Sequence, residues 1–230
     1  NSIGSSAFQR CSGLTEIRIP NIVKTIGDNA FQYCSGLTSL VIPDSLASVN
    51  WNAFSYCTNL KNVTIGSSLT SIGYAAFQNC TLLSSVNLTN SLKTIGDHAF
   101  EYTGLTNLII PESVTSIGYS SFGSCKDLSE IILPNSLTTI NDAAFNYCSG
   151  LKKITLGNAV TTIKGQVFYG CTNLMSIVIP ETVSSIGSNV FNNCTGLMSI
   201  TANPMYPINL SSNQNVFSGV DKIKCILNVP

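Results

Sequence analysis

One register of phenylalanines runs through the whole chain and constrains its fold more than any other feature. All ten phenylalanines of the 230-residue sequence belong to it. Seven of the nine intervals are 23 residues long, one is 22 and the last is 26. The positions are Phe8, Phe31, Phe54, Phe77, Phe100, Phe122, Phe145, Phe168, Phe191 and Phe217. This period indicates a solenoid, in which each repeat buries its apolar residues against its neighbours.

Each repeat contains a short alternating segment, as in residues 14–20 (LTEIRIP). The two isoleucines, Ile17 and Ile19, are separated by one polar residue, which predicts a strand with one buried face. A second apolar pair follows, as in Val23 and Ile26. Proline often closes the first strand, where a missing N–H has little effect. These prolines are Pro20, Pro43, Pro111, Pro134 and Pro180.

The chain then has to turn, and the residue at this corner is usually glycine or asparagine. Because these residues tolerate a positive φ, we expect a left-handed conformation there. The corner residues are Gly27, Asn50, Gly73, Gly96, Gly118, Asn141 and Gly187. Aspartates follow at three corners (Asp28, Asp97 and Asp142), and we expect them to cap a short helical turn that carries the Ala-Phe pair.

A 23-residue period around L-x-x-I-x-I predicts a leucine-rich-repeat solenoid. We expect a curved right-handed α/β-type superhelix with a parallel β-sheet on the concave face and short strands or helical turns on the convex side. Residues 1–202 form the array of about nine repeats, and residues 203–230 form an irregular repeat that starts a cap. Because the first repeat begins within its unit, we expect the sequence to be part of a longer chain.

Eight of the nine cysteines follow a phenylalanine by three residues. Paired zinc ligands at short spacing are absent from the sequence, and the single histidine, His98, cannot serve eight equivalent thiols as a catalytic base. Disulfides between neighbouring repeats are the alternative to a buried core column, which is the interpretation we favour. In the fifth repeat EYTGL replaces QYCSGL, so the cysteine is interpreted as deleted, which accounts for the 22-residue interval.

The composition excludes other classes of function. Eleven basic residues balance eleven acidic ones without runs of either sign, which argues against nucleic-acid binding. No apolar run reaches the length of a membrane span, so we expect no membrane insertion. Only 10% of the residues are charged, so Ser, Thr and Asn must cover the surface. We expect no cofactor, no metal and no catalytic residue.

The pattern C-x-x-L-x-x-I-x-I-P-x-S-V-x-x-I-G-x-x-A-F closely resembles the BspA-like, or Treponema pallidum type, leucine-rich repeats over residues 1–202. The resemblance implies a surface-exposed or secreted protein of a host-associated bacterium or a mucosal protozoan parasite. It also implies adhesion to host cells or to extracellular-matrix proteins such as fibronectin and fibrinogen. The family offers no catalytic motif. We expect a monomer that binds a protein partner.

Two rows of outward positions flank the buried centre of the strands and are candidates for this binding. They are Val41, Asn62, Thr64, Asn87, Asn107, Ile109, Glu130, Ile132, Lys153 and Thr155. Ile109 and Ile132 form a small apolar centre with Glu130 and Lys153 beside it, as in a protein interface. The alternative is that β-branched residues merely suit strands on either face.

Exposed aromatic residues form a second candidate. Trp51 and Tyr74 occupy one column in consecutive repeats, with Tyr119 two repeats further on. Such rings bind glycans or a partner, or they extend the packed edge of the solenoid. We expect His98 to be a surface residue beside Asp97.

Three functions compete: a binding or adhesion module, a passive spacer in a larger surface protein, and an enzyme. An enzyme requires a nucleophile, a base and a pocket at one place, whereas this sequence repeats the same unit. We therefore expect a non-enzymatic binding module at a cell surface or in a secreted protein, with the spacer as the alternative.

Overall fold

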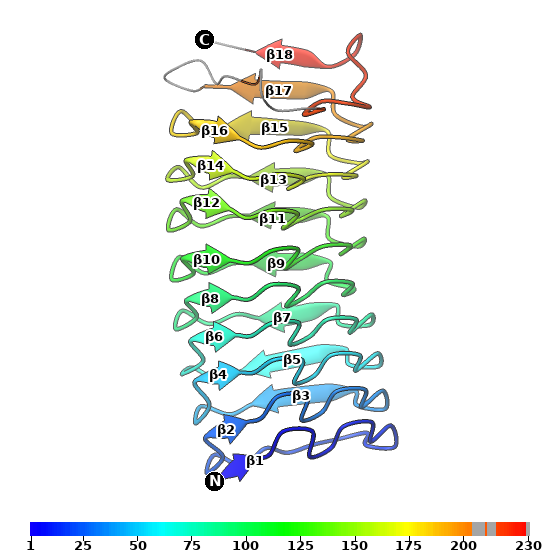
Figure 1. Cartoon of the computed structure of the whole chain (residues 1–230), viewed down its shortest axis with the longest axis vertical. Helices are drawn as coiled ribbons and strands as arrows, with labels where there is room; N and C mark the ends of the chain where they lie inside the picture. Colours follow the sequence, from blue (N-terminus) through cyan, green and yellow to red (C-terminus); the bar gives the residue numbers. More distant parts are fainter. Residues whose placement is uncertain (204–209, 211–214, 229–230) are drawn as a thin grey trace.

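The computed structural model describes residues 1–203, 210 and 215–228. In these residues the chain winds into a column of stacked coils (Figure 1). All recorded strand pairs are parallel, and each strand pairs with its counterpart in the neighbouring coil. The predicted solenoid of parallel strands is thereby confirmed, whereas the predicted curvature and hand remain predictions. The described part of the chain contains no helix long and apolar enough to cross a membrane.

The longer strands form the main sheet, with one strand in nearly every coil. Its strands are β3 (Ser39–Ile42), β5 (Asn62–Ile65), β7 (Ser85–Asn87), β9 (Asn107–Ile109), β11 (Glu130–Ile132), β13 (Lys153–Thr155), β15 (Ser176–Ile179), β17 (Ser199–Ala202) and β18 (Ile226–Asn228). Hydrogen-bonded ladders join β3 to β7 and β9 to β18, while β7 and β9 pack side by side without a recorded ladder. Residues 14–20 of the first coil, where a strand was predicted, carry no strand assignment.

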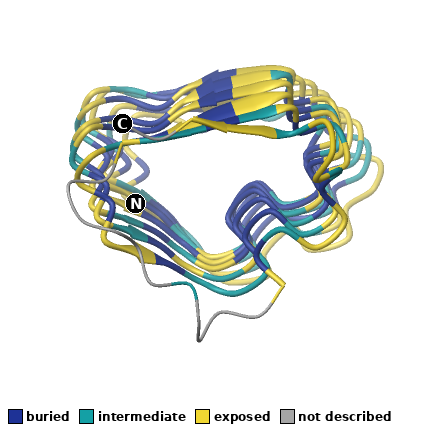
Figure 2. Cartoon of the chain, turned by 90° about the horizontal axis from the view of Figure 1, so that it is seen from above, coloured by how far each residue is buried: buried dark blue, intermediate teal, exposed yellow. Residues whose placement is uncertain are grey.

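Two-residue strands lie on the other side of the coils (Figures 1 and 2). They are β1 (Ser2–Ile3), β2 (Thr25–Ile26), β4 (Ser48–Val49), β6 (Ser71–Ile72), β8 (Thr94–Ile95), β10 (Ser116–Ile117), β12 (Thr139–Ile140), β14 (Thr162–Ile163) and β16 (Ser185–Ile186). The short strands were predicted, but the helical turns after them are not found in the described residues. The segments that carry the Ala-Phe pairs are non-helical turns.

Two residues in each of these turns explain the absence of a helix. Asn29 and Tyr33, for example, have φ of 58° and 61°, which lies outside the right-handed helical region. The backbone N–H groups also find partners outside their own turn. The Phe31 N–H donates to the Ala53 carbonyl of the next coil at 2.8 Å instead of to a carbonyl four residues earlier.

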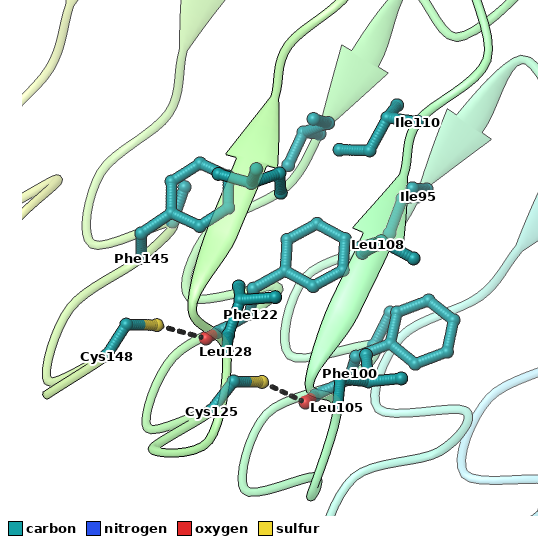
Figure 3. Close-up of a cluster of buried hydrophobic side chains, with 14 of the residues drawn as sticks. Ile95, Phe100, Leu105, Leu108, Ile110, Phe122, Cys125, Leu128, Phe145 and Cys148 are labelled. Carbon is teal, nitrogen blue, oxygen red and sulfur yellow. Dashed lines mark hydrogen bonds between the residues drawn. The ribbon is translucent and has the colours of Figure 1, made fainter. Parts of the chain in front are cut away.

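The phenylalanine rings stack on one another through the coils as the central column of the core. Neighbouring centroids lie 5.1–6.1 Å apart, and the ring planes differ by at most 17°. The eight rings from Phe31 to Phe191 are fully buried. Leucines and isoleucines of the strands surround this column (Figure 3). The phenylalanines that repeat every 22–26 residues in the sequence therefore form the centre of the hydrophobic core.

The fifth coil departs from the sequence interpretation. Thr103, three residues after Phe100, occupies the cysteine position and is buried. Its N–H donates to the Phe100 carbonyl at 3.3 Å, as the Cys34 N–H does to Phe31 at 3.1 Å. The interpretation that the cysteine is deleted is therefore wrong. A threonine replaces it, and the missing residue belongs to the turn between Thr103 and Leu105.

The corner residues also serve a different purpose from the one predicted. None of the corner glycines has a positive φ. The residue with a positive φ comes two positions after the corner, as at Asn29 and His98. Glycine is required because the coils approach closely. A Cβ atom on Gly96 would lie 2.8 Å from the carbonyl carbon of Gly73. Where asparagine stands instead, at Asn50 and Asn141, the ladder of short strands is interrupted, between β2 and β4 and between β10 and β12.

The aspartates after the corners stabilise the neighbouring coil instead of capping a helix. Asp97 Oδ1 accepts a hydrogen bond from the Tyr119 N–H at 2.7 Å, and Asp142 Oδ1 accepts one from the Gly165 N–H at 2.9 Å. Hydroxyl groups make similar links: Ser113 Oγ donates to the Leu92 carbonyl at 2.7 Å. Short polar side chains thus join the coils at the surface, which fits a chain with few charges.

The C-terminal part continues the stack in its described residues. Phe217 stacks on Phe191 with 5.5 Å between centroids, and β18 pairs with β17. The predicted boundary at residue 202 and the predicted cap remain predictions, since residues 204–209, 211–214 and 229–230 lie outside the described part.

Candidate protein-interaction surface

The outward side chains of the main sheet form two parallel rows, which we call the main-sheet face. One row contains Val41, Thr64, Asn87, Ile109, Ile132 and Thr155, and the other contains Asn62, Asn107, Glu130 and Lys153. All ten predicted residues are exposed. Their alternation with buried neighbours follows from the period of a strand, in which successive side chains point to opposite sides.

Ile109 and Ile132 are direct neighbours across the pair β9–β11. They are 83% and 56% exposed, although large aliphatic side chains are usually buried. Beside them the surface is hollowed by about 500 Å³, with Pro111 and Pro134 among the lining residues. We call Ile109, Ile132, Pro111 and Pro134 the apolar patch, in which the two isoleucines are exposed and the two prolines are buried residues that line the hollow. The prolines were predicted only to end strands, so their contribution was missed.

Polar groups border the apolar patch. Glu130 pairs with Asn107 on one side and with Lys153 on the other. The Lys153 Nζ and Glu130 Oε1 atoms lie 2.9 Å apart, and both side chains are about half exposed. An ion pair at such a surface adds little to stability, because water and salt screen it. Its charges remain available to a partner, which they can orient.

Of the remaining predicted residues, Thr155 lies on β13 beside Ile132, and the other four lie on the three-stranded part of the main sheet. Val41 is the neighbour of Thr64, and Thr64 is the neighbour of Asn87. Asn62 Oδ1 accepts a hydrogen bond from Ser85 Oγ at 3.0 Å, so this polar row is linked along the solenoid axis. The ten residues therefore share one face but belong to two ladders, which meet between β7 and β9.

The predicted aromatic candidates, Trp51 and Tyr74, lie beside each other but away from the main-sheet face. Their centroids are 6.0 Å apart, and they are 63% and 42% exposed. They directly follow the corners after β4 and β6, on the side of the short strands. The main-sheet face and these rings are thus two separate surfaces.

His98, which was expected only as a surface residue beside Asp97, is half-buried and extends this row of rings. Its ring centroid lies 5.4 Å from that of Tyr74 and 5.1 Å from that of Tyr119, both edge-to-face. His98 Nδ1 also lies 2.9 Å from Glu101 Oε2. The sequence gives little indication of this contact, because His98 stands one residue later in its repeat than the other rings.

The cysteines are confirmed as core residues from Cys34 to Cys194, whereas Cys11 in the first coil is exposed. Each of these seven buried thiols donates to the carbonyl of the phenylalanine in the preceding coil, with distances of 3.0–3.3 Å (Figure 3). Burial raises the pKa of Cys80 and Cys194 to about 12 and that of Cys125 to about 11. A thiol that keeps its proton is a poor nucleophile and a poor metal ligand. Among the described residues, no group of three or more His, Cys, Asp or Glu side chains is arranged to hold a metal ion.

Comparison with known protein families shows which family the chain belongs to. The profile of the BspA type leucine rich repeat region matches residues 1–129 and 116–227, with six copies. The chain belongs to the BspA-type leucine-rich-repeat family. The matched segments include both ladders of the main sheet, and the predicted resemblance is confirmed.

Solved structures of bacterial leucine-rich-repeat proteins are similar to this BspA-type chain. One is a leucine rich cell surface protein of Faecalibacterium prausnitzii, with 29% identity and a TM-score of 0.52 over 87% of this chain and 69% of that one. Another is the leucine rich repeat protein of T. pallidum, with 26% identity and a TM-score of 0.61 over 80% of this chain and 75% of that one. No match was found among curated proteins.

Proposed function

We propose that this solenoid is a non-enzymatic protein-interaction module of a cell-surface or secreted protein, and that it binds its partner through the main-sheet face. The apolar patch is the observation that carries the proposal. Two neighbouring isoleucines stand exposed beside an ion pair, and two buried prolines line the hollow next to them, which is the arrangement of an apolar centre with a polar rim.

Membership of the BspA-type family supports a role in protein interaction at a cell surface. The chain resembles a bacterial cell surface protein, which favours a surface location. The BspA-like resemblance favours adhesion to a host-cell or extracellular-matrix protein, such as fibronectin or fibrinogen. Each coil presents the same kinds of side chain, so a solenoid offers an extended binding surface instead of one convergent catalytic pocket. We propose that the module acts as a monomer.

The test is binding of this chain to immobilised fibronectin and fibrinogen, compared with the variant Ile109→Asp/Ile132→Asp. Both positions are exposed, so the variant should remain folded, with a small loss of stability because the two carboxylates would face each other across β9 and β11. If the apolar patch is the centre of the interface, Kd should rise by about 30-fold or more, as for a hot spot of about 2 kcal/mol.

The matched control is Val41→Asp/Thr64→Asp, which makes the same change in the same row three coils away. It should bind like the parent. Loss of binding in the control alone would place the interface on the other ladder and contradict the proposed centre. If the parent itself does not bind either protein at micromolar concentration, these partners are wrong and the passive spacer becomes the better interpretation.

A further inference from the structure

A column of acidic and aromatic side chains follows the short strands through six consecutive coils. Every member directly follows a corner residue, so the side chains stack one coil apart. The members of this acidic–aromatic column are Asp28, Trp51, Tyr74, Asp97, Tyr119 and Asp142. Three of the six aspartates of the chain lie in it. The column is on the side of the short strands, so it is independent of the main-sheet face.

The three rings of the column are exposed, and Trp51 and Tyr74 contact each other. Trp51, Tyr74 and Tyr119 are 63%, 42% and 46% exposed. The His98 ring fills the gap between the two tyrosines, so a continuous row of four rings results, with 5.1–6.0 Å between neighbouring centroids. A cation over the face of such a ring is attracted by the electrons of the ring.

The carboxylates are held in place beside these rings. Asp28 Oδ1 accepts a hydrogen bond from the Trp51 N–H at 3.3 Å, and Asp97 Oδ1 accepts one from the Tyr119 N–H at 2.7 Å. Asp28 and Asp97 are therefore fixed at the backbone of an aromatic residue in the next coil, whereas Asp142 is fixed at the backbone of Gly165. A cation that reaches Asp28 or Asp97 is therefore also near the aromatic residue to which that carboxylate is bonded.

These carboxylates lack a positive partner within the described residues. The ion pairs recorded there involve Glu101, Glu130 and Asp221, and none involves an aspartate of the column. Lys24 and Lys93 stand on the same side, four residues before Asp28 and Asp97, at the far end of the two-residue strands. Lys164 follows β14 and precedes Gly165, the partner of Asp142, but no ion pair recorded in the described part of the chain joins it to Asp142. The column itself contains three acidic groups and no base, so it favours a cationic ligand over a neutral or anionic one.

We propose that the acidic–aromatic column binds an extended peptide segment that carries arginine or lysine side chains. Asp28 and Asp97 are three coils apart and Asp97 and Asp142 two coils apart, which corresponds to about 14 Å and about 10 Å at a strand spacing of about 4.8 Å. An extended peptide covers these distances in about four and about three residues. The ligand therefore carries basic residues at positions i, i+4 and i+7, with their cationic groups at the carboxylates and over the rings.

Trp51 is the only tryptophan of the chain, so its fluorescence reports directly on this column. The probe is a capped octapeptide with arginine at its first, fifth and eighth positions and serine elsewhere. The matched control peptide carries citrulline, which is uncharged, in place of arginine. We expect a saturable change of Trp51 emission with the arginine peptide, at least tenfold weaker binding of the citrulline peptide, and loss of affinity in about 1 M salt, where the Debye length falls to about 3 Å.

The decisive variant is Asp28→Asn/Asp97→Asn/Asp142→Asn. Asparagine keeps an oxygen that accepts the backbone N–H, so the coils should remain in place while the charge is lost. We expect at least tenfold weaker binding of the arginine peptide. Asp44→Asn is the matched control, because Asp44 Oδ1 accepts the Ser67 N–H at 2.6 Å in the same way but lies outside the column. It should bind like the parent.

Two results would overturn the proposal. One is that the arginine peptide leaves the Trp51 emission unchanged, or binds the triple variant as well as the parent. The other is that a neutral oligosaccharide such as cellohexaose changes the emission, with equal affinity for the parent and the triple variant, while the arginine peptide does not. The row of rings would then be a carbohydrate platform. Neither result depends on fibronectin or fibrinogen binding, so this test and that of the main-sheet face fail independently.

Discussion

A cysteine of this solenoid fills a small apolar position and also supplies a hydrogen-bond donor. The Cys80 thiol donates to the Phe54 carbonyl at 3.2 Å, in the interior of the core. Valine has a similar volume but no donor, and serine is more polar, so cysteine combines the two requirements at this position. Thr103 meets them differently, since its Oγ1 donates to the Phe100 carbonyl of its own coil at 2.8 Å.

The raised thiol pKa predicts a loss of stability at high pH. Cysteine in the unfolded chain releases its proton near pH 9, whereas folded Cys80 keeps it up to about pH 12. The stabilisation is therefore complete below pH 9 and is lost as the pH rises from 9 toward 12, because the unfolded state is the one that binds fewer protons. Between pH 8 and pH 10, the free energy of unfolding of the parent should fall by about 1.4 kcal/mol more than that of Cys80→Ser. Urea denaturation of both proteins at the two pH values measures the difference, and equal decreases would contradict the buried neutral thiol.

At the scale of the element, one coil is defined as much by its neighbour as by its own sequence. The strands and the phenylalanine core were predictable, because alternation and the 23-residue period are visible within the chain. The reason for the corner glycines was not, because the close approach of Gly96 to Gly73 is a contact between coils. The roles of Asp97 and His98 were not predictable for the same reason. The hydrogen-bond partner of Asp97 lies in the next coil, and His98 contacts the rings of the column from one position later in its repeat.

The close approach at the corners predicts the effect of a single methyl group. Gly96→Ala would place its Cβ 2.8–3.0 Å from three backbone atoms of the preceding coil, which cannot move like the end of a side chain. We expect a loss of about 1–3 kcal/mol, the range of overpacking in a core. Gly13→Ala is the control, because a Cβ atom added to Gly13 would have no neighbouring atom within 4 Å. Chemical denaturation should separate the two variants, and equal stability would show that the coils adjust freely.

The candidate sites were predicted to different extents. The outward positions of the main-sheet face follow from strand alternation, so all ten residues were placed on one face in advance. The acidic–aromatic column was predicted only in its rings, because the role of its carboxylates depends on the register between coils. Whether Ile109 and Ile132 bind a partner remains a proposal, since strand geometry explains their direction but not their hydrophobicity.

At the scale of the whole molecule, stability is shared between adjacent coils. Phe100 stacks between Phe77 and Phe122 at 5.4 and 5.5 Å and is fully buried, whereas Phe8 stacks on Phe31 alone and is 40% exposed. In a linear array each coil contacts only its neighbours, so a defect in the middle weakens two interfaces and a defect at the end weakens one.

Phe100→Ala should therefore lower the free energy of unfolding by about 3–5 kcal/mol, and Phe8→Ala by clearly less. Amide hydrogen exchange should show the loss of protection centred on the coils that contain Phe77, Phe100 and Phe122 and decreasing with distance along the axis. An unchanged melting temperature for Phe100→Ala would overturn the stacked core.

The direction of the hydrogen bonds between coils has a mechanical consequence. They run along the axis of the column, from each strand to its counterpart in the next coil. A force that pulls the chain ends apart along this axis therefore loads the outermost row first, and a terminal coil peels off before the next is strained. Each released coil lengthens the chain by up to about 80 Å at about 3.5 Å per residue. Under tension the molecule would lengthen in steps, and the coils that still hold together would keep their binding surfaces.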